Sequence, residues 1–258
     1  MIYREGGFYM NNTIETILNH RSIRSFTDEL LTAEEIDTLV KSAQAASTSS
    51  YVQAYSIIGV TDPEKKRKLA ALAGNQPYVE NNGHLFVFCA DLYRHKKLAE
   101  EKGENITELL ENTEMFMVSV IDAALAAQNV SVAAESMGLG ICYIGGIRNE
   151  LDQVTEVLGT PDHVLPLFGL VVGHPAHPSG QKPRLPKQAV YHENTYDTNE
   201  ENFRSYMKEY DETISAYYDK RTNGKRVETW SDQILQFMKQ KPRTYLNQYV
   251  KDKGFQKN

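Results

Sequence analysis

The sequence predicts a fold of the α/β type, in which strands and helices alternate along the chain. Four short apolar segments have the length and composition of buried strands, and helix-forming segments separate them. The expected strands cover residues 56–61, 85–90, 141–144 and 167–172. No Gly-x-Gly-x-x-Gly motif follows any of these strands, so a Rossmann fold is disfavoured. The sequence also has no P-loop, His-Glu-x-x-His or Gly-x-Ser-x-Gly motif.

The expected helices have recognisable ends. The segment Thr32-Ala33-Glu34-Glu35 is a capping box, in which a hydroxyl and a carboxylate three residues apart satisfy free backbone N–H groups. It opens a helix that runs to about Ala46. Asp62 and Pro63 begin a second helix to about Ala73, with proline in the first turn. Further helices are expected over residues 12–19, from Asn149 to Gly159, after residue 199, and around Trp230 and Tyr245.

The longest apolar segment, residues 115–137, is expected to form a central helix that is buried on most sides. Its only charged residues are Asp122 and Glu135. A membrane span is the alternative, because the length is about right. Five polar residues in the segment argue against a span: Ser119, Gln128, Asn129, Ser131 and Ser136. We therefore expect no membrane partner, and a helix packed in the core or across a subunit interface.

Charge and composition exclude other classes of protein. The chain has 258 residues, a net charge of -6 and an isoelectric point of about 5.7, so we expect no nucleic-acid partner. The two cysteines, Cys89 and Cys142, lie in apolar segments and are expected to be buried thiols, which fits a cytoplasmic location. Among the histidines only His174 and His177 approach a metal-ligand spacing, in a proline-rich loop, so no metal site is expected.

The composition changes at Asn199, after which the chain is polar, helical and rich in tyrosine. We expect a core over residues 10–198 and a C-terminal helical excursion over residues 199–258, because no Gly- or Ser-rich linker separates them. Residues 1–9 are expected to be a non-native extension. Glu5-Gly6-Gly7 shortly precedes Met10, as the in-frame translation of a purine-rich ribosome-binding sequence would give.

Two polar segments near the N-terminus predict a site for an anionic cofactor. His20-Arg21-Ser22-Ile23-Arg24 combines two arginines with a hydroxyl, and Ser47-Thr48-Ser49-Ser50 is a run of hydroxyls. Arginine offers a rigid fork of donors to phosphate oxygens, and hydroxyls satisfy the oxygens that remain. Lys182-Pro183-Arg184 adds two more cations. The alternative is that the two arginines of the first segment only pair with surface carboxylates such as Asp28 and Glu29.

Six segments carry a more specific pattern, in a fixed order along the chain. They are HRSIRSFTDE (20–29), GLGICYIGGIR (138–148), HVLPLFGLVVGHP (163–175), KPRLP (182–186), HENTY (192–196) and ETWSD (228–232). In these segments the chain resembles the nitroreductase superfamily, and within it the NADPH-dependent nitroreductase and flavin reductase subfamily. The resemblance covers residues 11–255. It implies an α+β fold, with a central mixed, mainly antiparallel sheet surrounded by helices and an extended C-terminal helical excursion.

The resemblance also implies a homodimer with a tightly bound FMN at the subunit interface. No side chain is then needed as a nucleophile, because the flavin performs the chemistry. A cation at flavin N1 stabilises the reduced form, and either Arg24 or Lys182 could supply it. The cofactor-binding residues that match the family are His20, Arg21, Ser22, Arg24, Thr48, Ser49, Ser50, Gln76, Tyr143, Ile144, Gly145, Gly146, Lys182 and Arg184.

The co-substrate that the resemblance implies is NADPH, whose 2′-phosphate needs cations. Arg221, Lys225 and Arg226 match the family's 2′-phosphate region, and a solvated helix end is the alternative for this basic loop. Tyr51 and Arg243 are expected near the substrate. The alternatives for these two are core packing and a surface salt bridge.

The implied reaction is ping-pong. Hydride passes from NADPH to flavin N5, and a second substrate then receives two electrons at the same place. The family's acceptors are nitroaromatics, quinones and free flavins. One alternative is a flavin or disulfide reductase. Another is a non-catalytic protein that stores or senses FMN, which would need no arginines for the 2′-phosphate.

Overall fold

The computed structural model describes residues 2–4, 8–177, 179–240 and 243–258. The chain divides into two compact units, residues 1–179 with 245–258 and residues 180–244. The second unit begins before the expected boundary at residue 199. The last segment, residues 245–258, belongs to the first unit. In the expected N-terminal extension, β1 (Ile2–Arg4) pairs antiparallel with β2 (Phe8–Met10). Met1 and Glu5-Gly6-Gly7, on which that expectation depends, lie outside the described residues.

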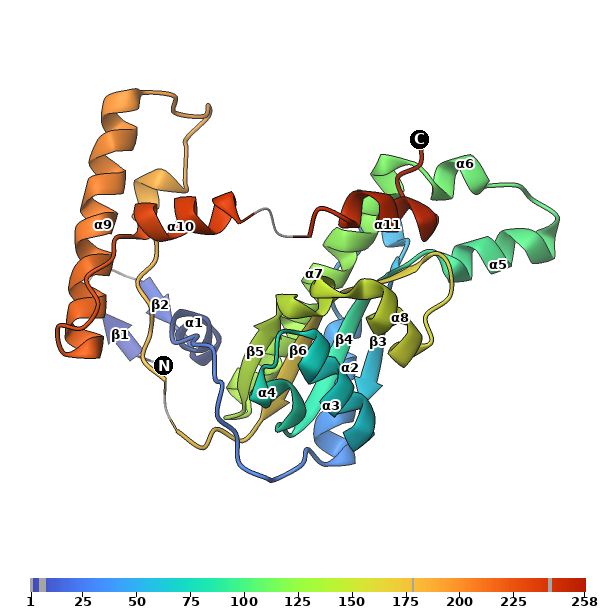
Figure 1. Ribbon diagram of the computed structural model, residues 1–258, viewed down its shortest axis with the longest axis horizontal. Coiled ribbons are helices and arrows are strands. Elements are labelled where there is room, and N and C mark those ends of the chain that lie inside the picture. The colour runs from blue at the N-terminus through green and yellow to red at the C-terminus, as the bar shows by residue number, and fades with distance from the viewer. Residues whose placement is uncertain (1, 5–7, 178, 241–242) are drawn as a thin grey trace. The chain divides into compact units, whose positions relative to one another are not determined.

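A four-stranded antiparallel sheet forms the centre of the first unit (Figure 1). The strand order is β3 (Tyr55–Val60), β4 (His84–Asp91), β6 (Val164–Gly173) and β5 (Gly140–Ile144). A parallel bridge between Ser22 and Ile141 adds the mixed character that the family resemblance implied. The α+β fold is therefore confirmed.

The α/β reading of the alternating pattern was wrong, for a reason seen between the first two core strands. Val60, the last residue of β3, lies opposite Leu85 near the start of β4. The connection over residues 61–83 therefore leaves and re-enters the sheet at the same end. A helical connection that returns to its starting end joins antiparallel neighbours, whereas a crossover joins parallel strands. Alternation along the sequence does not distinguish the two.

Helices cover both faces of this sheet. On one face α2 (Ala33–Gln44) and α7 (Thr113–Ser136) pack against Phe86 and Phe88 of β4. On the other face α3 (Pro63–Leu72) and α8 (Leu151–Leu158) pack in the cluster that contains Leu85 and Val87. Successive residues of a strand point to opposite faces, and both faces of β4 are buried. This double burial explains why β4 is apolar throughout.

The remaining elements of the first unit are short, and most helix ends agree with the sequence. The capping box at Thr32 is present, Asp62 caps α3, and Gly159 ends α8 in the left-handed conformation. The sequence predicted no helix over residues 93–102 or 107–110, which form two helices after β4. The further elements are α1 (Asn12–Leu18), η1 (Ser49–Tyr51), α4 (Pro77–Glu80), α5 (Tyr93–Lys102), α6 (Thr107–Leu110), η2 (Gly145–Asn149) and α11 (Leu246–Asp252).

The central helix α7 is long and apolar enough to cross a membrane by length and composition alone. One face of it is buried against α2 and the sheet, and this face includes Asp122. Another face leaves Met117, Ile121 and Leu125 exposed at intervals of four residues, so that they form one stripe. The helix is thus buried on part of its circumference, and the apolar stripe is free to meet a partner.

The second unit consists of η3 (Lys187–Ala189), α9 (Glu200–Thr222) and α10 (Trp230–Lys239). Its small core contains Tyr210, Ile214 and Tyr218, and the ring of Trp230 packs edge-on against Tyr210 at 5.6 Å. The helices expected around Trp230 and Tyr245 are present as α10 and α11. The second of these belongs to the first unit, where the Tyr245 hydroxyl accepts from the Leu151 N–H at 2.9 Å.

Candidate active site

The first basic segment, residues 20–24, runs beside the edge strand β5. The Ile23 N–H donates to the Ile141 carbonyl at 2.8 Å, and Ser22 forms the parallel bridge to the same residue. This approach requires glycine at position 140, since a Cβ there would lie 2.7 Å from Cγ1 of Ile23. At the start of the segment, the Nδ1 atom of His20 lies 2.8 Å from Oε1 of Glu135 at the end of α7.

The two arginines of this segment keep their charge available. Arg21 donates through Nε to the Asn19 carbonyl at 3.0 Å. Arg24 is exposed and lies beside Cys142, where it opposes the burial that raises the pKa of that thiol. Within the described residues, neither arginine forms an ion pair with a carboxylate. Guanidinium groups and a serine hydroxyl in one short segment are donors that fit a dianionic phosphate.

The glycine turn after β5 lies directly beside the turn that precedes α4. A Cβ at Gly146 would stand 2.3 Å from the Ala73 carbonyl oxygen and 2.8 Å from Nε2 of Gln76. Gln76 itself accepts from the Tyr78 hydroxyl and donates to Ala73. The structure therefore brings together Gln76 and the stretch that includes Ile144, Gly145 and Gly146. Glycine is required at position 146 because the Ala73 carbonyl and the Gln76 side chain occupy the place of a Cβ.

Tyr143 precedes this turn and is partly exposed. Its ring packs edge-on against Phe168 at 5.6 Å, and its hydroxyl lies 3.4 Å from the side-chain oxygen of Gln128. Burial of part of the ring raises the pKa of Tyr143 to about 12. The hydroxyl is therefore neutral at physiological pH and can donate a hydrogen bond.

The hydroxyl segment, residues 47–50, lies in a strained loop between α2 and β3. We call this the hydroxyl loop. Thr48 precedes the short helix η1, and Ser50, Tyr51 and Gln53 all have positive φ angles, of 47°, 60° and 54°. Non-glycine residues in this conformation cost on the order of 1 kcal/mol or more each. Strain of this kind persists where surrounding groups hold it, and it is frequent at ligand sites. Tyr51 projects from the loop with 82% of its surface exposed, which excludes a core role.

One chain does not bring the hydroxyl loop to the first basic segment. The N–H of Ser49 donates to Asp122 in the middle of α7, whereas His20 contacts Glu135 at the end of the same helix. These two carboxylates are almost four helical turns apart, about 20 Å at 1.5 Å per residue. In one chain the two segments therefore contact different parts of α7.

The remaining candidates lie in the second unit. Lys182 and Arg184 are exposed, and the Lys182 ammonium stands 5.5 Å from the centre of the Tyr218 ring. The Arg226 guanidinium stacks on that ring at 4.0 Å. The ring of Tyr218 therefore contacts one cation from each of two predicted sites.

The cationic side chains of the basic loop after α9, residues 221–226, have different surroundings. Arg221 donates to the Tyr217 hydroxyl at 3.0 Å, and Lys225 is exposed. Arg226 donates through Nε and Nη2 to Oε2 of Glu228, at 2.9 and 2.7 Å. Arg243, expected near the substrate, is half-buried with a φ angle of 57°.

Four residues near the site had no sequence prediction of a role. Asp122 and Glu135 stand out in the sequence only as the charges of an apolar segment, and each contacts a predicted site segment. Their position on the inward face of a helix is the signal that could have identified them. Arg94 and His95 come from α5 and contact carbonyl groups of the hydroxyl loop. No cluster of three metal-ligating side chains occurs in the part of the chain that the structure describes.

Among the described residues, the arginines of the first basic segment have no carboxylate partner and lie along the edge strand β5, which suits a protein that binds an anionic cofactor. Two family models match the chain. The nitroreductase family model covers residues 17–174, and the model of the nitroreductase family C-terminal domain covers residues 182–258. The chain therefore belongs to the nitroreductase family.

Individual relatives agree over almost the full length. The FMN reductase (NADPH) of Bacillus subtilis (strain 168) is 85% identical over 249 residues, which are 96% of this chain and 100% of the relative. The solved structure of the NfrA1 nitroreductase from B. subtilis has a TM-score of 0.94 at 84% identity, covering 95% of this chain and 100% of that one. The NADPH:FMN oxidoreductase of Vibrio harveyi, complexed with NAD+, has a TM-score of 0.85 at 42% identity, covering 96% and 100%.

Proposed function

We propose that this chain is an NADPH-dependent, FMN-containing oxidoreductase that reduces nitroaromatics, quinones or free flavin by a ping-pong mechanism. The observation that carries the proposal is the pair Arg21 and Arg24, whose charges no carboxylate neutralises among the described residues, close to the backbone of β5. The relatives named FMN reductase (NADPH) and NADPH-dependent oxidoreductase support the same cofactor and donor. The two free, buried thiols support a cytoplasmic location.

In this proposal FMN, when bound, supplies the two-electron chemistry of the reaction. The chain's own residues position and tune it. Arg21, Ser22 and Arg24 hold the phosphate, with His20 oriented by Glu135. The backbone of Gly145 and Gly146, next to Gln76, is the proposed contact of the ring. Lys182 and Arg184 add positive charge, and Lys182 or Arg24 stabilises the negative charge of the reduced ring. Thr48, Ser49 and Ser50 supply hydroxyl donors.

The proposal includes a homodimer with the cofactor at its interface. Two observations support it. The hydroxyl loop and the first basic segment contact points about 20 Å apart on α7, and a second copy could bring its own segment to either point. The apolar stripe on α7 offers a surface that such a copy could bury.

The basic loop supports the choice of NADPH over NADH. Arg221 and Arg226 both lie against tyrosine rings, which limits the motion of their guanidinium groups. An arginine held in this way is suited to the 2′-phosphate that only NADPH carries. The carboxylate of Glu228 occupies the Arg226 donors and would have to leave. Tyr51 and Arg243 are the proposed residues near the acceptor.

The purified protein tests the proposal directly. An absorption spectrum should show flavin bands, and anaerobic NADPH should bleach them rapidly while NADH bleaches them slowly. A colourless protein that takes up no added FMN would contradict the assignment of the cofactor. A yellow protein that neither nucleotide bleaches would instead support a protein that stores or senses FMN.

A further inference from the structure

The loop of residues 48–55 keeps its strained conformation although its tip faces solvent. Ser50 and Tyr51 are exposed, and only Ala54 near its end is buried in the core. Apolar packing therefore does not explain why three of the four residues from 50 to 53 adopt the left-handed conformation. The polar groups of neighbouring helices do explain them.

A buried carboxylate holds the N–H groups of this loop. Oδ1 of Asp122 accepts from the Ser49 N–H at 2.9 Å, and Oδ2 accepts from the Ala54 N–H at 3.0 Å. The side chain is fully buried, so both bonds are shielded from water. The two donors are the residues on either side of the strained positions. One carboxylate thus fixes both ends of the left-handed segment.

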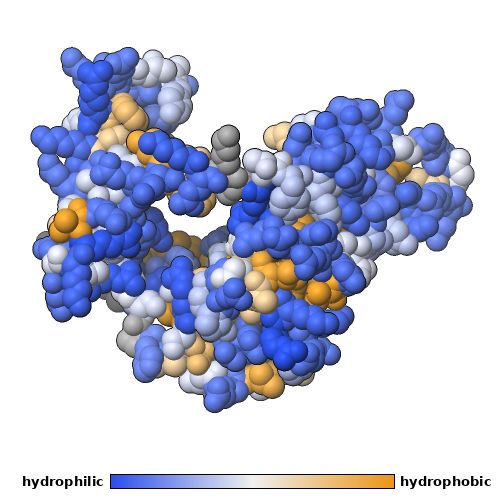
Figure 2. All heavy atoms as spheres, in the orientation of Figure 1, coloured by the Kyte–Doolittle hydropathy of each residue, from blue (hydrophilic) through white to orange (hydrophobic). Residues whose placement is uncertain are grey.

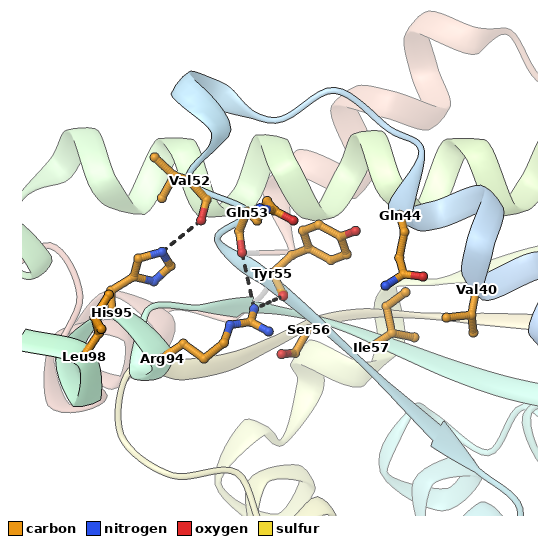
Figure 3. A pocket seen from close by; sticks show the side chains of 10 residues that line it. All are labelled: Val40, Gln44, Val52, Gln53, Tyr55, Ser56, Ile57, Arg94, His95 and Leu98. Atoms are coloured by element: carbon orange, nitrogen blue, oxygen red, sulfur yellow. Dashed lines mark hydrogen bonds between the residues drawn. The ribbon is translucent and has the colours of Figure 1, made fainter. Parts of the chain in front are cut away.

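Two side chains of α5 hold the carbonyl groups of the same loop, and Figure 3 shows both. Nε2 of His95 donates to the Val52 carbonyl at 2.9 Å. Nη2 of Arg94 donates to the carbonyls of Gln53 and Tyr55, at 3.3 and 2.6 Å. These groups line a cavity of about 700 Å³ behind the loop.

The guanidinium of Arg94 is itself held in place. Oδ2 of Asp91 lies 3.6 Å from its Nη2 atom, and Asp91 also accepts from the Tyr93 N–H at 2.9 Å and from the Ser56 hydroxyl. The loop is therefore fixed by an anion on its N–H groups and by cationic and imidazole donors on its carbonyl groups. Each charge meets the pole of the peptide dipole that it stabilises.

We propose that Asp122, Arg94 and His95 form a clamp of positioning residues that holds the hydroxyl loop in its flavin-binding conformation. This inference rests on the proposed function of Thr48, Ser49 and Ser50. The clamp acts through these residues and contacts no substrate itself. Because the loop is preorganised, binding of FMN does not have to order it, and affinity increases accordingly.

The variant Asp122→Asn tests the first half of the clamp. The amide keeps the shape of the side chain but turns one acceptor into a donor that faces a backbone N–H. We expect the Kd for FMN to rise at least tenfold, and the amide protons of Ser49 and Ala54 to exchange faster with solvent. Ser119→Ala is the matched control, because Ser119 is fully buried one turn earlier and bonds only within α7.

The variants Arg94→Met and Arg94→Lys test the second half without touching the core, since the Arg94 side chain is 59% exposed. We expect the Kd for FMN to rise about threefold or more in Arg94→Met and less in Arg94→Lys, with little change in the unfolding midpoint. A purely structural role would move the unfolding midpoint and leave the FMN affinity unchanged.

The clamp is contradicted if folded Asp122→Asn and Arg94→Met both bind FMN within twofold of the wild type. A different result is expected if the hydroxyl loop does not contact FMN. In that case the double variant Thr48→Val/Ser50→Ala would also leave the FMN affinity unchanged, and amide exchange at Ser49 and Ala54 would decide whether Asp122 fixes the loop.

Discussion

In the proposed function, Glu228 and the 2′-phosphate of NADPH compete for the same guanidinium group of Arg226. The two side chains are 40% and 55% exposed, so their attraction is weak and an incoming dianion can replace it. Arg226 would keep its place when Glu228 leaves, because its guanidinium still stacks on Tyr218. The released carboxylate would lie just before the first turn of α10, where the helix dipole favours an anion.

We therefore expect Glu228→Gln to lower the KM for NADPH by a factor of about two to five, as for the loss of one weak surface ion pair. The KM for NADH should stay the same, because NADH has no 2′-phosphate. Steady-state kinetics with both donors measures the effect. Arg226→Gln is the matched variant and should raise the KM for NADPH only. A higher KM for NADPH in Glu228→Gln would mean that Glu228 orients Arg226 instead of competing for it.

At the same scale, the sequence predicted charged and hydroxyl residues more readily than the residues that position them. Arg21 and Arg24 could be predicted to bind phosphate because their chemistry is local to one short segment. Asp122 could not be connected with Ser49, because 73 residues separate the partners and only the fold joins them. A buried charge has a partner, but the sequence does not name it.

At the scale of elements, strands and capped helices were predicted well and α5 was missed. β4 was recognised because both of its faces are buried and it is therefore apolar throughout. Helix α5 has the sequence Tyr-Arg-His-Lys-Lys-Leu-Ala-Glu-Glu-Lys, and Ala99 is its only buried residue. Such a helix lacks the apolar stripe on which prediction depends. Strand direction was predicted by the family resemblance and not by the alternation of strands and helices, because direction depends on where each connection ends.

The junction of α3 and β4 makes stability depend on pH. His84, the first residue of β4, is buried beside Lys66 of α3, and its Nε2 atom has no hydrogen-bond partner among the described residues. Burial and the charge of Lys66 lower the pKa of His84 from 6.5 to about 4. The unfolded chain therefore binds this proton below about pH 6.5, and the folded chain does so only near pH 4. Stability is present above pH 6.5 and is lost as the pH falls.

We expect the free energy of unfolding to fall by about 2–3 kcal/mol between pH 6.5 and 4 through His84 alone. In His84→Leu that part of the pH dependence should disappear, as urea denaturation at several pH values would show. His177→Ala is the control, because His177 is exposed. Equal pH dependence in His84→Leu and the wild type would contradict the assignment to this residue.

In the whole molecule, the apolar stripe of α7 stays uncovered by the part of the chain that the structure describes. Hydrophilic residues cover most of the surface in the view of Figure 2, and the mean hydropathy of the chain is -0.49. Met117, Ile121 and Leu125 nevertheless remain 43–52% exposed in one row. The stripe runs along the helix that carries Asp122 and Glu135, the contacts of the hydroxyl loop and of the first basic segment. A second copy packed here would bring its own site segments to this helix.

We therefore expect assembly and cofactor binding to fail together. Ile121→Asp places a charge in the centre of the stripe. We expect the wild type to sediment as the proposed dimer and this variant to sediment as a monomer. The same variant should retain less than a tenth of the FMN of the wild type, because each half-site then lacks the segment that the partner supplies. Gln153→Asp adds the same charge on an exposed position of α8 and should change neither property. A monomeric protein with full FMN content would contradict the shared site, since one chain would then hold the cofactor without a segment from a partner.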